Sequence, residues 1–440
     1  MFLKLRYYFR FIFAFLGRFK FIILLGIIIG FVLFIAVKYL DRFVTGINTQ
    51  RVGIVGRYRS DSLPDYVLDD IGDGLTIIND EGEVEPNLAK SWDTTDKGKT
   101  WVFTLGDDLK WQDGKDITSY DINYDFSDVT IEKPDKNTIV FNLEEPFTPF
   151  PYIVSKPVFK KGLLGAGDWK VDDVIISNGY VQEIKISNAD GNKKVIRFYP
   201  TEDEAKLAYK LGRINTIEGL LNSSPFEKWV NTNMEKEVKS DSVITLFFNT
   251  EDQLISSKQV RQALIYGIDK ESMSDERAIS PISKDSWAYN PQVKPYVYDT
   301  ERAKDLISDI PDEQINNGIK LVTTPSLLET AEKIASYWNS IGMQTTVLVS
   351  SVLPEDFQVF LTIFELPKDP DQYSIWHSTQ EPTNISNYKN PRIDKLLEDG
   401  RTELVKEERK KIYLDFQRFL VEDSPAAFLY YPDIYSISRK

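Results

Sequence analysis

The spacing of apolar residues changes about halfway along the chain. In the first half, short runs rich in β-branched and aromatic residues at 51–58, 72–92 and 137–147 alternate with segments rich in Gly, Asp and Asn. Such runs predict strands joined by turns. We expect a strand, a tight turn and a second strand within 99–114, and a strand that ends at Pro146. The first half of the chain is therefore predicted to be mostly β.

The second half has a strand–helix–strand order. The segment 318–325 predicts a strand, the helical period of 327–342 predicts a helix, and 343–350 predicts another strand. Gly342 is a suitable helix stop. This order indicates a parallel α/β unit. Further elements are expected at 243–250 (strand), 257–273 (helix), 357–366 (buried strand), 403–423 (long helix) and 426–431 (final strand).

An uncharged segment near the N-terminus is at the short end of what spans a bilayer. Residues 21–37 carry no charge, and no acidic residue occurs among the first 40. Five basic residues come before or at the start of this segment: Lys4, Arg6, Arg10, Arg18 and Lys20. The positive-inside rule then predicts a cytoplasmic basic segment at 1–20, a transmembrane signal anchor at 21–40, a tether at 41–50 and an extracytoplasmic remainder. A cleaved signal peptide is the alternative, and the absence of a small-x-small cleavage site favours the anchor.

Composition excludes several kinds of chemistry. A formal net charge of −14 disfavours nucleic-acid binding, which needs a basic face. The chain has no cysteine, so disulfides, thiolate catalysis and iron–sulfur clusters are excluded. His377 is the only histidine, which is too few for the usual zinc set, and no G-x-S-x-G elbow accompanies it. Nothing singles out a pair of carboxylates for glycoside hydrolysis. We therefore predict no enzyme, no cofactor and no bound metal.

Five blocks of the chain share features with one family. They include "GLTIINDEGEVEPNLAKSWDTTDKGKTWVF", "FFNTEDQLISSKQVRQALIYGIDKESM" and "SWAYNPQVKPYVYDTERAKDLI", and they lie at 74–126, 247–273, 286–307, 387–401 and 426–437. Together, in this order, they resemble the family 5 extracytoplasmic solute-binding proteins, the peptide- and nickel-binding receptors of ABC importers. The resemblance covers the chain from about residue 51 to its end.

The resemblance implies an α/β fold of two lobes, of the type II periplasmic-binding-protein kind, with an extra subdomain on the first lobe. The segment that follows residue 126 is shorter than in most members, so this subdomain is expected to be reduced. We expect the chain to cross between the lobes at the strands 243–250 and 426–431, about which the lobes should open and close. The first lobe is predicted to span 51–246 completed by 426–440, and the second lobe 247–425.

The stretch "FELPKDPDQYSIWHSTQ", residues 364–380, is the main candidate for the ligand site. In peptide-binding members a strand edge here pairs with the peptide backbone, and an acidic residue holds the α-amino group. The alternatives for that acidic residue are Glu365, Asp369 and Asp371. The other candidate ligand-binding residues are Asn249, Trp287, Tyr289, Phe364, Tyr373, Trp376 and His377. For Trp376, pocket lining and core packing are equal alternatives.

These features predict a membrane-anchored, monomeric receptor that captures oligopeptides outside the cell for ABC permease subunits. A different ligand is the first alternative: a metal chelate, for which His377 with Trp376 keeps the option open, an oligosaccharide or a lipid-like molecule. A surface sensor that does not transport is the second alternative. No nucleic-acid partner is expected.

Overall fold

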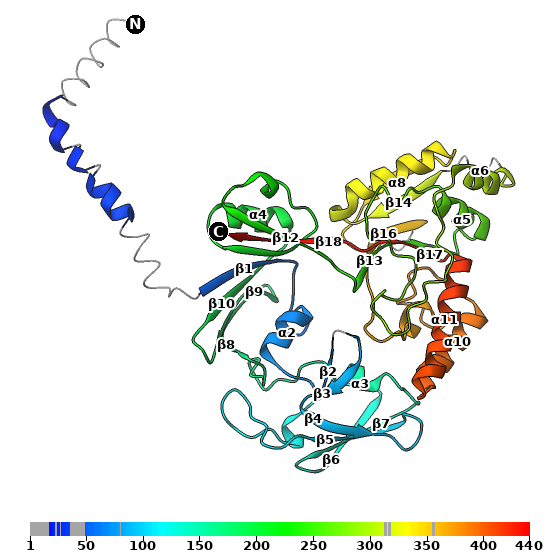
Figure 1. Cartoon of the computed structure of the whole chain (residues 1–440), viewed down its shortest axis with the longest axis horizontal. Helices are drawn as coiled ribbons and strands as arrows, with labels where there is room; N and C mark the ends of the chain where they lie inside the picture. Colours follow the sequence, from blue (N-terminus) through cyan, green and yellow to red (C-terminus); the bar gives the residue numbers. More distant parts are fainter. Residues whose placement is uncertain are drawn as a thin grey trace, which may run out of the picture.

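The computed structural model describes residues 17–22, 24–26, 28–35, 49–79, 81–311, 315, 318–353 and 357–440. Most of these residues belong to two lobes, each built on its own sheet (Figure 1). The expected tether falls largely outside the described residues, as does most of the expected basic segment. The mixed α/β, two-lobed architecture agrees with the fold class that the sequence predicts.

The first lobe contains a seven-stranded sheet in the order β12-β18-β11-β1-β10-β9-β8. Its central strand β1 runs parallel to β10 and β11. Helix α2 (Asp65–Ile71) packs beside β8, and helix α4 (Glu202–Lys210) packs on β1, β10 and β11. The strands are β1 (Thr49–Val55), β8 (Trp169–Ser177), β9 (Tyr180–Asn188), β10 (Lys193–Tyr199), β11 (Thr216–Leu220), β12 (Thr232–Val238) and β18 (Asp433–Arg439).

A smaller β subdomain, residues 74–160, is inserted between α2 and β8. It holds the pair β2 (Thr76–Ile78) and β3 (Val84–Pro86), helix α3 (Phe150–Ile153), and the four-stranded sheet β4-β5-β7-β6, with β4 (Ala89–Asp93), β5 (Thr100–Leu105), β6 (Val129–Asp135) and β7 (Thr138–Leu143). Its core is strongly aromatic: Phe141 lies 5.6 Å from Phe103 and 4.9 Å from Phe150 between ring centroids. The prediction of a second strand within 99–114 is wrong. Asp108 turns the chain with a positive φ of 57°, and only an isolated bridge joins Lys110 to Asp116.

The second lobe contains a five-stranded sheet in the order β15-β14-β16-β13-β17. Strands β14 and β15 are parallel and are joined by helix α8, which confirms the predicted α/β unit. The elements are β13 (Ser242–Phe248), α5 (Lys258–Tyr266), α6 (Thr300–Ser308), β14 (Ile319–Thr323), α8 (Leu328–Ser340), β15 (Thr345–Val349), β16 (Val359–Glu365), α9 (Tyr373–Trp376), α10 (Pro391–Thr402), α11 (Lys406–Asp423) and β17 (Ala426–Tyr430).

The chain crosses between the two sheets just outside the strands that the sequence suggested. Strands β13 and β17 both lie wholly in the second lobe's sheet, whereas β12 and β18 pair with each other in the first. The crossings are therefore the short segments 239–241 and 431–432, where the Lys239 N–H donates to the Pro432 carbonyl at 3.0 Å. This corrects the lobe boundaries expected at 246/247 and 425/426. It also adds β18 beyond the strand that we expected to be the last.

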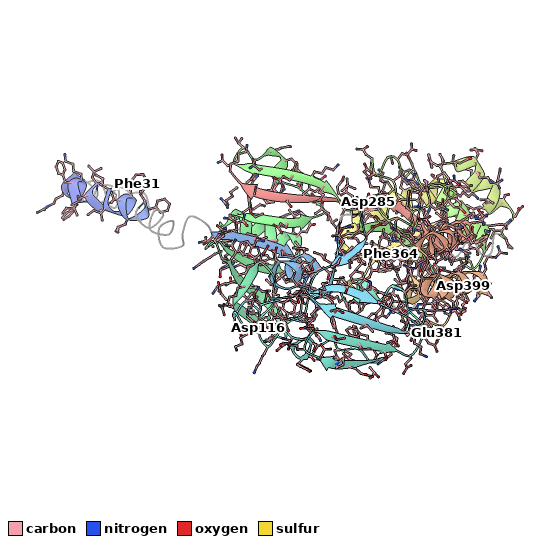
Figure 2. The ribbon with its side chains drawn as sticks, turned by 60° about the horizontal axis from the view of Figure 1, so that its bottom comes forward. Phe31, Asp116, Asp285, Phe364, Glu381 and Asp399 are labelled. Atoms are coloured by element: carbon pink, nitrogen blue, oxygen red, sulfur yellow. The ribbon has the colours of Figure 1, made fainter. Side chains whose placement is uncertain are left out.

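One helix among the described residues, Gly17–Ile35, is long and apolar enough to cross a membrane. Its mean hydropathy is 2.5, and none of its most apolar window is buried against the rest of the described chain. Its apolar side chains, such as Phe31 (Figure 2), are exposed.

Candidate ligand-binding cleft

Part of one edge of strand β16 has no partner strand among the described residues. Strand β16 pairs with β13 along its whole length, from Val359 to Glu365. On its other side it pairs with β14 only from Val359 to Leu361. The segment 362–365 is therefore bare on that side, at the end of the strand nearest the first lobe. Figure 2 shows Phe364, in this segment, near the middle of the molecule.

The direction of the backbone groups follows from the alternation of a strand. The Leu361 carbonyl accepts a hydrogen bond from Thr323 Oγ1 of β14 at 3.4 Å, so it points to the β14 side. The Leu366 N–H donates to the Asp241 carbonyl at 2.8 Å, which is on the β13 side. Because groups two residues apart point the same way, the N–H and C=O of Ile363 and Glu365 face the bare edge. A bare strand edge is a template on which an extended chain can pair.

Helix α2 and the residues before it lie near the end of this edge. Burial raises the pKa of Tyr58, and the charge of Glu365 adds to that shift. Burial also raises the pKa of Asp69, while Lys368, which follows β16, opposes the shift. Tyr66 on the same helix is 52% exposed. The bare edge therefore faces a first-lobe wall that carries tyrosines and carboxylates.

Two of the three acidic candidates are already paired. Asp369 accepts two hydrogen bonds from Arg409 of α11, Nη1 to Oδ2 at 2.7 Å and Nη2 to Oδ1 at 2.6 Å, and both side chains are buried. Asp371 lies 3.4 Å from Arg401 of α10; burial raises the pKa of Asp371 and Arg401 opposes the shift. Glu365 is exposed and forms no ion pair within the described part of the chain. Of the three, only Glu365 offers a free carboxylate.

Arg409 was not recognised in the sequence. Helix α11 was expected to turn apolar residues inward, yet its buried face includes Arg409, Tyr413 and Gln417. Their regular spacing of four residues places them on one face of the helix and could have indicated a buried polar stripe.

Of the two alternatives for Trp376, pocket lining and core packing, the structure shows core packing. Its side chain is fully buried and stacks on Phe247 at 5.8 Å, with Phe364 and Phe428 edge-on to it. Its indole N–H donates to Gln372 Oε1 at 2.7 Å. Trp376 thus belongs to the core of the second lobe, as does the buried Phe364.

The two other rings of the stretch are placed differently. Tyr373 is half-buried, and its ring lies 4.0 Å from that of His377 and 4.1 Å from the Arg401 guanidinium. His377 is buried; its Nδ1 shares a 2.8 Å hydrogen bond with Thr379, and its Nε2 lies 3.5 Å from Glu398. Only Tyr373 of this pair is partly open to solvent.

Asn249 lies away from the cleft. It follows β13 at the end opposite Ser242, which places it about 20 Å from the Glu365 end of the sheet, at roughly 3.3 Å per residue. Its amide donates to the Phe357 carbonyl at 2.9 Å and accepts from Asn387 at 3.0 Å. Asn249 therefore joins two loops of the second lobe, and its role at a ligand stays an untested prediction.

Trp287 lies where the second lobe meets the β subdomain. Burial raises the pKa of Tyr152 of α3 to about 12; the charge of Asp369 adds to this shift and the nearby Trp287 opposes it. Trp287 is half-buried, with Arg409 5.6 Å from the centre of its ring. Tyr289 is also half-buried. Burial raises the pKa of Tyr289, and the charge of Lys284 opposes this shift.

A separate hollow lies on the outer side of the second lobe. It has a volume of about 200 Å³ and is lined by Glu251, Ser378, Glu381, Asn384, Asn387 and Lys389. The described residues contain no group of three or more His, Asp or Glu side chains that could hold a metal ion.

The family model of the bacterial extracellular solute-binding proteins, family 5, matches residues 83–181 and 187–381. The chain belongs to this family. Members are substrate receptors rather than enzymes, so this solute-binding protein is an extracytoplasmic receptor.

Relatives and solved structures agree with that assignment. The chain is 23% identical over 420 residues to a probable D,D-dipeptide-binding periplasmic protein of Escherichia coli K12, covering 79% of each chain. It is 23% identical over 446 residues to the oligopeptide-binding protein AppA of Bacillus subtilis 168, covering 82% of this chain and 80% of that protein.

Two solved structures support the two-lobed fold. NikZ from Campylobacter jejuni in complex with Ni(L-His) superposes with a TM-score of 0.75 at 22% identity, covering 89% of this chain and 94% of that one. The nonapeptide complex of Bacillus subtilis AppA superposes with a TM-score of 0.71 at 20% identity, covering 89% and 95%.

Proposed function

We propose that this solute-binding protein captures extended oligopeptides between its two lobes and delivers them to ABC permease subunits. The observation that carries the proposal is the bare edge of β16 at 362–365, with the backbone groups of Ile363 and Glu365 turned away from β13. An extended peptide that adds to such an edge gains main-chain hydrogen bonds whatever its side chains are. Such pairing would let one receptor accept many sequences. The names of the curated relatives, which include dipeptide- and oligopeptide-binding proteins, agree with this ligand class.

Glu365 is proposed as the group that holds a ligand's free amine. It ends β16, it is exposed, and Asp369 and Asp371 are engaged by Arg409 and Arg401. A peptide paired to the bare edge with its amino terminus near residue 365 would place its ammonium beside this carboxylate. Tyr58, which contributes to the same end of the cleft, can then contact the first residue of the peptide.

The helix Gly17–Ile35 is proposed to hold the receptor at the membrane as an uncleaved anchor. Its length and hydropathy suit a bilayer, and Arg18 and Lys20 at its start favour a cytoplasmic N-terminus. Retention of the full-length chain in the membrane fraction after alkaline carbonate extraction is the expected result. A soluble, N-terminally shortened chain would contradict the anchor and leave the ligand proposal standing.

Calorimetric titration of the full-length chain in detergent against peptide pools of two to eight residues tests the ligand class. A peptide that binds is then methylated at one backbone nitrogen at a time. Pairing to β16 predicts strong loss of affinity at alternate positions only, because only those N–H groups face the protein edge. Absence of binding for every length, or equal loss at every position, would remove the strand-pairing proposal.

Substitution of Ile363 gives a matched test on the protein side. Ile363→Pro and Ile363→Ala both shorten the side chain, but only proline removes the outward N–H, and that group has no partner among the described strands. We expect peptide affinity to fall at least about tenfold further in Ile363→Pro than in Ile363→Ala. Equal affinities in the two variants would argue against a hydrogen bond at this position.

A metal chelate is a second candidate ligand class, because a solved structure of similar fold was determined in complex with Ni(L-His). His377 is an unsuitable ligand for it, because its ring is buried, stacked on Tyr373 and hydrogen-bonded to Thr379. Native mass spectrometry of the purified receptor would distinguish a co-purified peptide from a chelate. Uptake of labelled peptide by cells with and without the receptor would distinguish transport from sensing.

A further inference from the structure

The β subdomain contacts the second lobe at a place far from the two crossings. Figure 1 shows the lower ends of α10 and α11 beside the subdomain, while the crossings lie at the opposite side of the lobes. Three separate contacts join the two surfaces. The Thr148 N–H donates to the Arg401 carbonyl, the Arg401 guanidinium lies 4.9 Å from the centre of the Phe147 ring, and Glu83 forms an ion pair with Lys406.

Arg401 makes two kinds of contact with the subdomain. Its carbonyl, one of the last in α10, accepts a 2.8 Å hydrogen bond from the Thr148 N–H. Carbonyls at the C-terminal end of a helix have no N–H donor within the helix and are free to accept such a bond. Its guanidinium lies between two rings, 4.9 Å from Phe147 of the subdomain and 4.1 Å from Tyr373 of its own lobe. The two flat faces of the Arg401 guanidinium thus contact one ring from each body. A carboxylate oxygen of Asp371 lies 3.4 Å from Arg401 Nη2.

Hydrogen bonding at this contact is incomplete. The Arg401 Nε and the Thr148 hydroxyl are both buried, and neither has a hydrogen-bond partner among the residues that the structure describes. Buried polar atoms without partners oppose the contact, because each would regain a hydrogen bond to water on separation. The favourable stacking of Arg401 and the unfavourable burial of these two atoms therefore act against each other at one surface. Such a balance suits a contact that closes and releases.

We propose that the subdomain and the second lobe form a latch that needs no ligand, with Arg401 stacked between Phe147 and Tyr373 as its main element. The latch holds the cleft shut at the side opposite the crossings. Ligand entry then requires the latch to release. The latch differs from the strand edge of β16 because none of its contacts involves the segment 362–365.

The absence of cysteine makes the latch measurable by paired spin labels. We suggest Asp116→Cys on the subdomain and Glu381→Cys on the second lobe, two exposed positions that Figure 2 labels. Distances are measured by double electron–electron resonance on the full-length, ligand-free chain. We expect one narrow distribution with Arg401 intact. Arg401→Ala should add a longer-distance population at least about three times that of the parent.

Three further variants make the result decisive. Phe147→Leu removes the ring from the subdomain side and should produce the same longer population. Arg401→Lys keeps the charge but not the flat guanidinium, and should fall between the parent and Arg401→Ala. Arg418→Ala on α11 removes an exposed arginine that forms an ion pair with Asp415 of its own helix, and it should leave the distribution unchanged.

An unchanged distribution in both Arg401→Ala and Phe147→Leu would overturn the proposal, as would a parent that is already broadly open. If Arg401→Ala does not fold, Phe147→Leu decides alone from the other side of the contact. The measurement uses no ligand. Its failure is therefore distinguishable from failure of the peptide-binding proposal.

Discussion

Arg409 donates two parallel hydrogen bonds of 2.7 and 2.6 Å to Asp369, and the two side chains are only 5% and 7% exposed. Burial alone would lower the pKa of Arg409, but the Asp369 charge raises it overall. The pair joins the long helix α11 to the loop that follows β16. It engages one of the three carboxylates that the sequence leaves as alternatives for binding a ligand amine.

Loss of one partner of this pair should be strongly destabilising. We expect Arg409→Met to lower the free energy of unfolding by about 3–5 kcal/mol, because it leaves Asp369 buried without its counter-charge. Replacing both, as Asp369→Leu with Arg409→Met, should recover part of the loss. Urea unfolding followed by circular dichroism measures both, with the exposed Arg418→Ala expected within about 0.5 kcal/mol of the parent. A loss below about 1 kcal/mol in Arg409→Met would contradict the structural role of the pair.

Trp376 should behave as a core residue. Its burial against Phe247, Phe364 and Phe428 predicts that Trp376→Ala lowers the free energy of unfolding by about 3–5 kcal/mol without a ligand present. Trp287→Ala is the matched comparison, since Trp287 is half-buried and should cost less. Thermal and urea unfolding of the two variants decide the order. Normal stability with weakened peptide binding in Trp376→Ala would show that Trp376 lines the cleft and is not a core residue.

Glu365 should discriminate peptides by their amino terminus. We expect Glu365→Gln to weaken binding of a free-amine peptide by about tenfold and to leave its N-acetylated form nearly unchanged. Titration of both peptides against both proteins forms a double-mutant cycle. Additive effects of acetylation and substitution would show that the amine lies elsewhere, and Asp69→Asn would then be the next variant because Asp69 faces the same end of the cleft.

Lys270 should make stability depend on pH. Burial, with a smaller effect of Arg277, lowers the pKa of Lys270 from 10.5 to about 7, although its ammonium donates to the carbonyls of Ile265 and Ile268. Below pH 7 the lysine is protonated in both states, and its unfavourable contribution is largest there. Between pH 7 and 10.5 only the unfolded chain binds the proton, so the free energy of unfolding rises with pH.

The matched variant Lys270→Met lacks this dependence. We expect the stability of the parent relative to Lys270→Met to grow by about 2–3 kcal/mol between pH 7 and pH 9, since each pKa unit corresponds to about 1.4 kcal/mol. Urea unfolding at half-unit steps of pH measures the difference. Parallel curves for the two proteins would show that Lys270 keeps an ordinary pKa.

Local periodicity was sufficient for most elements of the fold. The strand–helix–strand unit at β14, α8 and β15 was predicted because the apolar period of a helix or strand is a property of neighbouring residues. The same information failed at the crossings. Strand β13 is buried along its whole length, and a run of apolar residues does not reveal which of two sheets buries it.

The site depended on contacts between residues distant in sequence. Asp369 is paired with a side chain 40 positions away, and Asn249 meets Asn387 from 138 positions away. The sequence, through its family resemblance, made the stretch 364–380 the main candidate for the ligand site, because residue types and their order are local. Only the tertiary structure showed that Trp376 packs inward, that Asp369 is neutralised by Arg409, and that the edge of β16 is bare, because each of these depends on which distant segment lies beside it.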